Sequence, residues 1–117
     1  MPTLLFIYGM LHPDRAPAEI AAAARRLIPR GPATIRARLY NLGAYPGAVL
    51  DSSAAPISGS LFAVPDAETL AALDAYEDFH PADPANSLFL RVETTATTPD
   101  GSSHPCWVYV YNREVPR

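Results

Sequence analysis

The amino-acid sequence predicts an α+β fold in which a small, mixed and largely antiparallel β-sheet carries two main helices. Five or six segments have the alternating or continuous apolar pattern of strands, whereas two segments have a helical pattern. Two of the strands flank the turn TPDGS at residues 98–102, which predicts a hairpin. Because strands outnumber crossover helices, the pattern favours an antiparallel sheet, which can curl into a β-barrel, over a parallel doubly wound fold.

The composition is that of one folded domain, residues 1–117, with 49% hydrophobic and 18% charged residues. The net charge is −3 and no basic cluster is longer than Arg25-Arg26, which disfavours a nucleic-acid partner. The apolar run at residues 4–8 is too short to cross a membrane and has no basic residue before it, so neither a membrane nor a signal peptide is expected. A single cysteine, Cys106, excludes an internal disulfide, and a cytoplasmic location is expected.

The chain opens with a predicted strand and a predicted helix. Residues 4–8 are continuously apolar, rich in aromatic and branched side chains, and end at Gly9, as in a buried strand. Residues 17–28 predict a helix with proline in its first turn, a run of four alanines and two arginines near its end. The sequence PRGP at residues 29–32 is predicted to stop this helix.

Three further strands are predicted before the second helix. Residues 33–42 alternate between apolar and polar side chains, as in a half-exposed strand. Residues 48–50 form a short candidate strand, and residues 57–64 form a longer one. Gly59 lies inside the longer strand, where a glycine often marks a bend or a close approach of another backbone.

The second half of the chain predicts one helix and a hairpin. Asp66 is a favourable N-cap for a helix that ends at about residue 76 or 77. A loop with two prolines follows at residues 78–86. Residues 87–97 and 104–111 then alternate as two strands on either side of the predicted turn.

One acidic side chain lies on the apolar stripe of the second helix. At 100° per residue, Leu70 and Leu73 define the centre of this stripe, and Glu77 points along its middle. An acid is costly in such a place unless something requires it. In one interpretation Glu77 is exposed just past the helix end or is paired with an arginine such as Arg91. In the other it is buried, has a raised pKa and acts as a general acid/base.

Other reactive side chains give weaker signals. The seven serines lack the context of a nucleophile elbow, and His12, His80 and His104 lack the spacing of metal ligands, so surface positions are expected for the histidines. Cys106 alternates with apolar residues and is predicted to be a buried structural thiol. The loop after Gly9 either presents backbone N–H groups to a carboxylate or phosphate or is an ordinary turn. No nucleotide-binding motif is present in the sequence.

Short motifs occur along the chain in a specific order. They are YGML at residues 8–11, GAYP at 43–46, LDAYE at 73–77, and FLR at 89–91 ahead of WVYVY at 107–111. Together they resemble the gamma-glutamylcyclotransferase-like superfamily, in particular its short bacterial and gamma-glutamylamine cyclotransferase-type members. The resemblance extends over roughly residues 3 to 112.

The resemblance implies a small barrel-like α+β fold with a cavity, and it implies a reaction. The free α-amine of a γ-glutamyl group attacks its own γ-carbonyl, which gives 5-oxoproline and releases an amine or amino acid. Glu77 is implied to be the catalytic acid/base. The implied substrate-binding residues are Tyr8, Gly9, Met10, Leu11, Tyr45, Phe89 and Arg91. The partner is then a small-molecule γ-glutamyl substrate, with no metal and no organic cofactor, and the protein is expected to be a monomer or a small homo-oligomer.

Three residues depart from the pattern of the superfamily. Met10 stands where threonine or serine is usual, Asp78 where glycine is common, and Phe89 where tyrosine is usual. Met10 and Phe89 each remove a hydroxyl group, which favours a second hypothesis: a non-catalytic module that binds a small carboxylate or amine in the same cavity. A third hypothesis is a different amide or acyl transfer on the same scaffold, since a fold does not fix a function.

Overall fold

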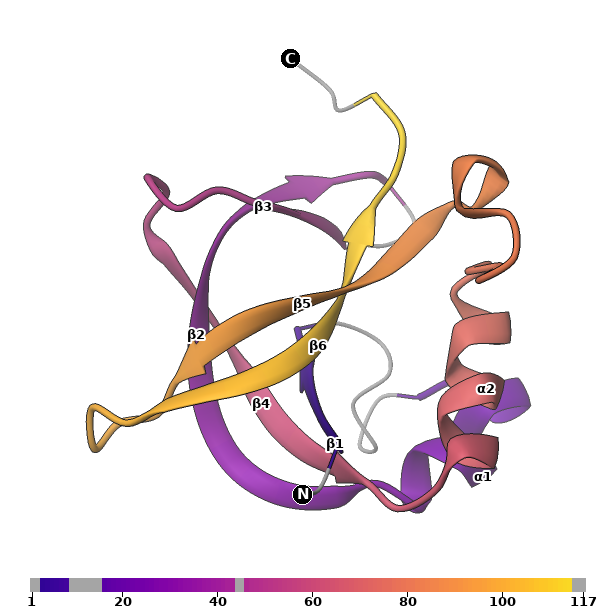
Figure 1. Cartoon of the computed structure of the whole chain (residues 1–117), viewed down its shortest axis with the longest axis horizontal. Coiled ribbons are helices and arrows are strands. Elements are labelled where there is room, and N and C mark those ends of the chain that lie inside the picture. The colour runs from indigo at the N-terminus through magenta and orange to yellow at the C-terminus, as the bar shows by residue number, and fades with distance from the viewer. Residues whose placement is uncertain (1–2, 9–15, 44–45, 115–117) are drawn as a thin grey trace.

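The protein is described by a computed structural model, in which residues 3–8, 16–43 and 46–114 are described. Both main helices and the strands expected from the sequence are present along these residues (Figure 1). In chain order the elements are β1 (Thr3–Ile7), α1 (Ala18–Arg25), β2 (Ile28–Asn41), β3 (Pro46–Leu50), β4 (Pro56–Val64), α2 (Ala67–Tyr76), the short 3-10 helix η1 (Pro84–Asn86), β5 (Phe89–Thr97) and β6 (Ser103–Tyr111).

The sheet closes on itself into a barrel. Its strand order is β3-β2-β4-β1-β6-β5, and β2 also pairs with β5 where Thr34 lies opposite Thr97. Five strands therefore form the ring, and β3 is hydrogen-bonded to β2 as an added strand. The pairing of β1 with β6, at Leu5 and Trp107, is parallel, and the other pairings are antiparallel. The predicted fold class, a small mixed and largely antiparallel barrel with two helices, is confirmed.

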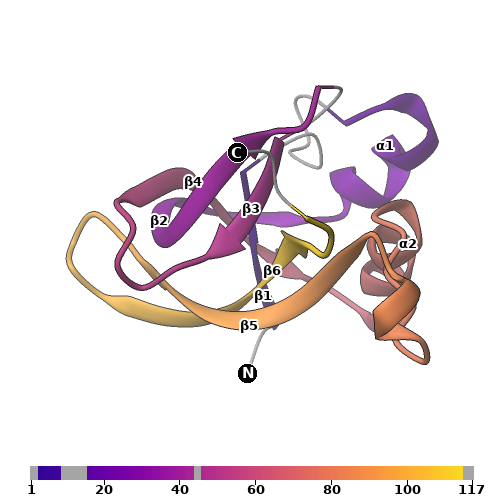
Figure 2. The same cartoon turned by 90° about the horizontal axis from the view of Figure 1, so that it is seen from above.

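Both helices lie on the same side of the barrel. Figures 1 and 2, seen from perpendicular directions, show α1 and α2 side by side, with α2 next to the beginning of β5. The guanidinium of Arg26, at the end of α1, donates a hydrogen bond of 3.0 Å from Nε to the hydroxyl oxygen of Thr69 on α2. Arg26, which is exposed, therefore links the two helices at their surface.

The region between α1 and β2 differs from the sequence prediction. The helix ends at Arg25, and Ile28, which was predicted to close the helix, is the first residue of β2 and pairs with Ala63. The PRGP segment at 29–32, predicted to be a helix stop, is part of the strand. The pairing of β2 with β4 shifts its register between Pro29 and Gly31, and this shift accommodates a proline, which has no N–H to donate. Gly31 adopts a φ of 103° there. The turn residues therefore produce a bulge instead of a loop.

Alternation along the strands builds two separate hydrophobic clusters. On β1, Leu5 and Ile7 face the helices, whereas Phe6 faces the interior of the barrel. The helix-side cluster joins α1 and α2 to the outer face of the barrel through residues such as Ile20, Leu27, Phe62, Leu73, Phe89 and Tyr109. The interior cluster combines small side chains with larger ones: Phe6, Ala33, Ile35, Ala37, Ala48, Leu61, Ala96, Cys106 and Val108. Cys106 is buried, as predicted.

Gly59 on β4 is required by close packing inside the barrel. A Cβ atom at this position would lie 2.5 Å from the carbonyl oxygen of Ile7 and 2.5 Å from Cζ of Phe6. Both distances are shorter than a non-bonded contact allows, so a side chain here would have to displace the backbone of β1 or the ring of Phe6. The predicted close approach at this glycine is confirmed.

Candidate active site

Helix α2 carries the acidic side chain that the sequence singles out. Its first turn is capped as expected, because Oδ1 of Asp66 accepts a hydrogen bond of 2.7 Å from the backbone N–H of Thr69. The helix ends at Tyr76, and Glu77 is the C-cap residue. The backbone N–H of Glu77 still donates to the carbonyl of Leu73, at 3.0 Å. The direction of Glu77 is therefore set by the last turn of the helix.

A two-hydrogen-bond cap fixes the chain on the far side of Glu77. The N–H of Phe79 donates to the carbonyl of Asp74 at 2.9 Å, and the N–H of Asp78 donates to the carbonyl of Ala75 at 3.2 Å. This pattern is a Schellman motif, which places one residue in the left-handed region. That residue is Asp78, with a φ of 57°. Aspartate is one of the few residues besides glycine that adopt this region.

Burial changes the chemistry of the Glu77 carboxyl group. The residue is partly exposed, yet the protein around it removes enough water to raise its pKa from the usual 4.5 to about 7. Desolvation is the cause of this shift, because burial disfavours the charged form of a carboxyl group. Within the described parts of the chain, the Glu77 side chain has no hydrogen-bond or ion-pair partner. Glu77 is thus able to hold or release a proton near neutral pH.

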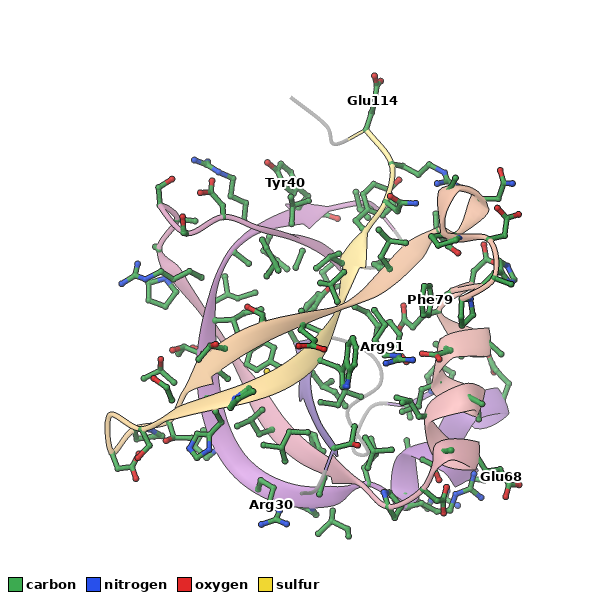
Figure 3. The ribbon with its side chains drawn as sticks, viewed as in Figure 1. Arg30, Tyr40, Glu68, Phe79, Arg91 and Glu114 are labelled. Atoms are coloured by element: carbon green, nitrogen blue, oxygen red, sulfur yellow. The ribbon has the colours of Figure 1, made fainter. Side chains whose placement is uncertain are left out.

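Arg91 is not the partner of Glu77. Its Nε and one terminal nitrogen instead form a two-point ion pair with Asp74, at 2.8 and 3.2 Å. The guanidinium also lies 4.4 Å from the centre of the Trp107 ring and 5.6 Å from that of the Phe79 ring. Figure 3 shows Arg91 in the space between the β5–β6 hairpin and α2, beside Phe79. The pairing of Glu77 with Arg91, one of the two interpretations of the sequence, is wrong.

Asp74 is held by two strands at once. Besides the ion pair with Arg91 on β5, its Oδ1 accepts a hydrogen bond of 2.7 Å from the Tyr109 hydroxyl on β6. Asp74 is 6% exposed and Tyr109 is 4% exposed, so the network is shielded from water. The pKa of Tyr109 is raised by burial and by its bond to the Asp74 carboxylate. Asp74, Arg91 and Tyr109 together form what is called here the α2 brace.

Tyr8 connects the brace to the strand that leads into the predicted binding loop. Its hydroxyl donates to the carbonyl of Tyr109 at 2.6 Å and accepts from the N–H of Ala48 at 3.1 Å. Burial raises the pKa of Tyr8, and the charge of Glu77 adds to this effect. The charge of Glu77 also contributes to the raised pKa values of Tyr76 and Tyr109. Tyr8, Tyr109 and Glu77 therefore lie within electrostatic reach of one another.

The predicted substrate-binding residues have different surroundings. The charge of Glu77 contributes to the raised pKa of Tyr8, as described above. Phe89 is buried in the helix-side cluster with its ring 5.6 Å from that of Tyr111, and Arg91 is part of the brace. Their role toward substrate stays a prediction. Gly9, Met10, Leu11 and Tyr45 lie outside the described residues.

The brace residues Asp74 and Tyr109, together with Trp107, were not assigned a role from the sequence. Asp74 stands in the LDAYE motif and Tyr109 in WVYVY, so the motifs contained them. A helical projection carries a usable signal, since Asp74 follows Leu70 by four residues and shares its face. The residues that pair with Asp74 depend on how α2 packs against β5 and β6, and a single sequence does not specify this packing.

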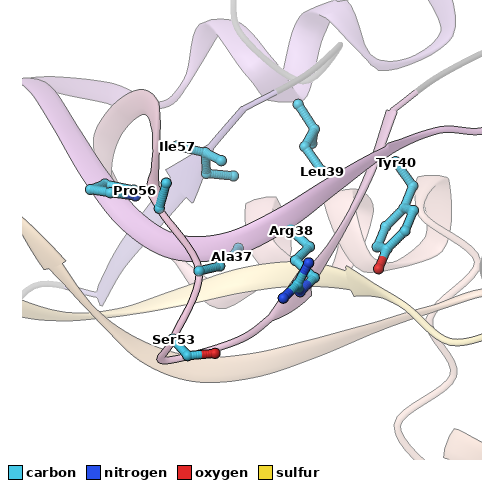
Figure 4. Close-up of a pocket in the computed structure, with 9 residues that line it drawn as sticks. Ala37, Arg38, Leu39, Tyr40, Ser53, Pro56 and Ile57 are labelled. Carbon is cyan, nitrogen blue, oxygen red and sulfur yellow. The ribbon is translucent and has the colours of Figure 1, made fainter.

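Other sites in the described chain offer less chemistry. An open groove lies between β2 and the segment that leads into β4, and Figure 4 shows Arg38 and Tyr40 along it. In this groove, Nε of Arg38 forms an ion pair with Oδ2 of Asp51 at 2.6 Å. In the described segments, no group of three or more His, Cys, Asp or Glu side chains is arranged to hold a metal ion. No helix among these residues is long and apolar enough to cross a bilayer.

The histidines were predicted to lie at the surface, and two of them can be placed. His80 is exposed and pairs with Asp78 at 2.7 Å. His104 is half-buried beside the hairpin turn, 3.3 Å from the hydroxyl of Thr98. His12 is outside the described residues.

Several solved structures share this fold. An AIG2-like protein from Mus musculus superposes with a TM-score of 0.74 at 19% identity, over 98% of this chain and 80% of that one. YkqA from Bacillus subtilis has a TM-score of 0.71 at 19% identity over 96% of this chain, which spans only 36% of YkqA. A protein described as gamma-glutamyl cyclotransferase has a TM-score of 0.71 at 14% identity, over 95% of this chain and 67% of that one. These likenesses establish the fold.

The sequence itself gives the family. No curated protein matches the chain in a comparison of whole sequences. The sequence profile described as "Gamma-glutamyl cyclotransferase, AIG2-like" matches residues 5–117, which is nearly the whole chain. The barrel, the two helices on one of its sides and the ordered motifs agree with that match. The protein therefore belongs to the gamma-glutamyl cyclotransferase, AIG2-like family.

Proposed function

We propose that the protein is a cyclotransferase that closes the γ-glutamyl group of a γ-glutamyl amine or peptide to 5-oxoproline, with Glu77 as the general acid/base. Membership of the family supports this class of activity. The observation that carries the assignment of Glu77 is a desolvated carboxyl group at the end of α2, whose pKa is raised to about 7. A general acid/base works best when its pKa is near the working pH.

The proposed reaction needs no nucleophile from the protein. The α-amine of the substrate attacks the γ-carbonyl carbon, so a new C–N bond closes the five-membered ring. The bond from that carbon to the leaving nitrogen then breaks. Glu77 takes a proton from the attacking amine and delivers it to the leaving nitrogen, which leaves as a neutral amine. Because attacker and target belong to one molecule, correct folding of the bound substrate provides much of the rate enhancement.

The negatively charged groups of the substrate are proposed to bind at the loop that follows Tyr8. Backbone N–H groups of Gly9, Met10 and Leu11 are proposed to bind the substrate's α-carboxylate or the oxyanion that forms during attack. The Tyr8 hydroxyl bonds to the backbone of both β6 and β3, which anchors the start of this loop. The proposal therefore places the charged end of the substrate next to Tyr8 and its γ-carbonyl next to Glu77.

Replacing Glu77 with Gln tests the proposal. The variant keeps the size and polarity of the side chain but loses its proton transfer, so 5-oxoproline release should fall by about 10²–10⁴-fold. The measurement is 5-oxoproline formation from a panel of γ-glutamyl amines and peptides. Glu68→Gln is the matched control, because Glu68 lies on the same helix and is exposed in its first turn. Full turnover by Glu77→Gln contradicts the mechanism.

The same experiment separates an enzyme from a binding module. The hydroxyl groups that Met10 and Phe89 lack favour a binding module as the second candidate. A binding module should gain thermal stability from a γ-glutamyl compound and form no 5-oxoproline with any member of the panel. Product formation by the wild-type protein excludes this alternative.

A further inference from the structure

One arginine contacts side chains on both sides of Glu77 along the chain. Arg91 forms a two-point ion pair with Asp74, three residues before Glu77, and its guanidinium lies 5.6 Å from the ring centre of Phe79, two residues after it. Asp74 and Phe79 are also joined directly, because the Phe79 N–H donates to the Asp74 carbonyl at 2.9 Å. Glu77 thus sits in a short closed segment whose two ends are both in contact with β5.

Tyr109 extends this arrangement to the opposite side of the site. Its hydroxyl donates to Asp74, and its backbone carbonyl accepts from the hydroxyl of Tyr8. Tyr8 and Tyr109 both feel the charge of Glu77. Tyr109 therefore joins α2, whose end carries Glu77, to the end of β1, from which the predicted binding loop begins, by one hydrogen bond from its side chain and one to its backbone.

We infer that Arg91, Asp74 and Tyr109 are positioning residues: they hold the end of α2 against β5 and β6 so that Glu77 stays in its desolvated place and at a fixed distance from Tyr8. This inference rests on the proposed function where it concerns turnover. Its geometric part concerns Glu77 alone and can be tested without turnover. A buried ion pair is weak evidence for stability but is well suited to specifying one arrangement of the elements it joins.

The choice of variant follows from the charges in the brace. Removing Asp74 or Arg91 leaves the other as an unpaired buried charge, which destabilises the protein and shifts the field at Glu77. Tyr109→Phe removes one hydroxyl and no charge at neutral pH, so it loosens the brace and leaves the ion pair in place. Tyr111→Phe is the matched control, because Tyr111 lies on the same strand and its hydroxyl has no hydrogen-bond partner among the described residues.

The titration of Glu77 is the first measurement. The titratable groups that sense its charge come from three elements: Tyr8 at the end of β1, Tyr76 on α2 and Tyr109 on β6. These tyrosines are neutral across the range in which Glu77 titrates. Water that enters when the brace loosens should therefore lower the pKa of Glu77 in Tyr109→Phe by about one unit. Carbon-13 NMR of glutamate-labelled protein, with the Glu77 signal assigned through Glu77→Gln, measures this shift.

Two further readouts distinguish positioning from general stability. Hydrogen exchange of the Phe79 amide, which closes the helix cap, should accelerate in Tyr109→Phe while amides in the middle of β4 keep their rates. In turnover assays, kcat should fall by about 10- to 100-fold with little change in KM, because a displaced acid/base impairs chemistry more than binding. The rise of kcat/KM with pH should also move to lower pH, following the pKa of Glu77.

A second variant keeps the inference testable if Tyr109→Phe does not fold. Arg91→Lys preserves the positive charge but cannot form the two-point pair, so it should lower the pKa of Glu77 in the same direction. An unchanged Glu77 pKa and Phe79 exchange rate in a folded Tyr109→Phe or Arg91→Lys protein overturns the inference. Equal shifts in Tyr111→Phe overturn it as well. Failure of the proposed function is a separate result, because it is judged from 5-oxoproline formation by Glu77→Gln and not from the brace variants.

Discussion

At the scale of single residues, Glu77 combines two properties that rarely occur together. It is the C-cap of α2, where carboxyl groups gain nothing from the helix dipole, and it is desolvated without a positive partner in the described chain. Both properties disfavour its charged form. A position that raises the pKa in this way costs stability at neutral pH, and such costs are typical of residues retained for chemistry.

The stability of the protein should reveal this cost through its dependence on pH. The pKa of Glu77 is raised from 4.5 to about 7 on folding, so the folded state holds the proton more tightly than the unfolded state does. The resulting stabilisation is complete below pH 4.5 and is lost as the pH rises to about 7. Above that pH the folded protein holds the Glu77 carboxylate in its charged form in a desolvated place, which lowers stability.

Glu77→Gln, which cannot ionise, should therefore be more stable than the wild type at pH 8 by about 1–3 kcal/mol. The difference should shrink as the pH is lowered toward 5. Urea unfolding of both proteins at several pH values between 5 and 8 measures it. A constant difference for Glu77→Gln across this range contradicts the desolvated placement.

The sequence predicted the position of Glu77 but not which acid on α2 pairs with Arg91. Helical spacing placed it at the end of the apolar stripe, and α2 indeed ends one residue before it. The pairing of Arg91 could not be foreseen, because Asp74 and Glu77 are both acids within one turn of the same helix. Which of them meets Arg91 depends on the rotation of α2 about its own axis, and Thr69, Leu73 and Asp74 are the residues that this rotation buries.

At the scale of elements, local signals predicted most of the strands and missed one boundary. Periodicity located both strands of the hairpin, whose register runs from Phe89 opposite Tyr111 to Thr97 opposite Ser103. It failed at the PRGP segment, because two prolines and a glycine indicate a turn in isolation. Long-range pairing with β4 converts this segment into a bulged strand, and such pairing is invisible to a short sequence window.

The glycines of two strands differ in the atoms that a side chain would meet, which gives an element-scale prediction. Gly59→Ala on β4 would place Cβ against the backbone oxygen of Ile7, and this oxygen is fixed in the sheet. We expect the substitution to destabilise the protein by about 1–3 kcal/mol, as overpacking does. Chemical denaturation of the variant measures the change.

Gly47→Ala on β3 is the comparison. Its Cβ would approach a terminal carbon of Leu42 most closely, at 2.6 Å, and Leu42 is a flexible side chain outside the strands. The cost should therefore be smaller than at Gly59. A larger loss of stability for Gly47→Ala than for Gly59→Ala contradicts the packing described for the barrel interior.

At the scale of the whole molecule, closure of the barrel separates the interior cluster from the helix-side cluster beneath α1 and α2. Cys106 belongs to the interior cluster, and burial raises the pKa of its thiol to about 11. Fewer thiolate ions form at a given pH, and the barrel wall shields the sulfur from reagents. The thiol therefore reports on whether the barrel is closed.

We expect Cys106 in the folded protein to react with a disulfide reagent at pH 8 at least about 100-fold more slowly than in the unfolded protein. The absorbance of the released thiol, followed with and without denaturant, measures both rates. Equal rates in the two conditions would show that the barrel does not enclose this side chain.

The topology also constrains the order in which the strands can pair during synthesis. β1 is made early, yet it lies between β4 and β6 in the sheet, and its parallel neighbour β6 is the last strand of the described chain. During synthesis, β1 can pair with β4 well before β6 has left the ribosome. Its second edge then remains open until the β5–β6 hairpin has emerged. A nascent chain paused before the hairpin would thus expose one apolar, unpaired strand edge, which makes this stage the one at which chaperone binding should matter most.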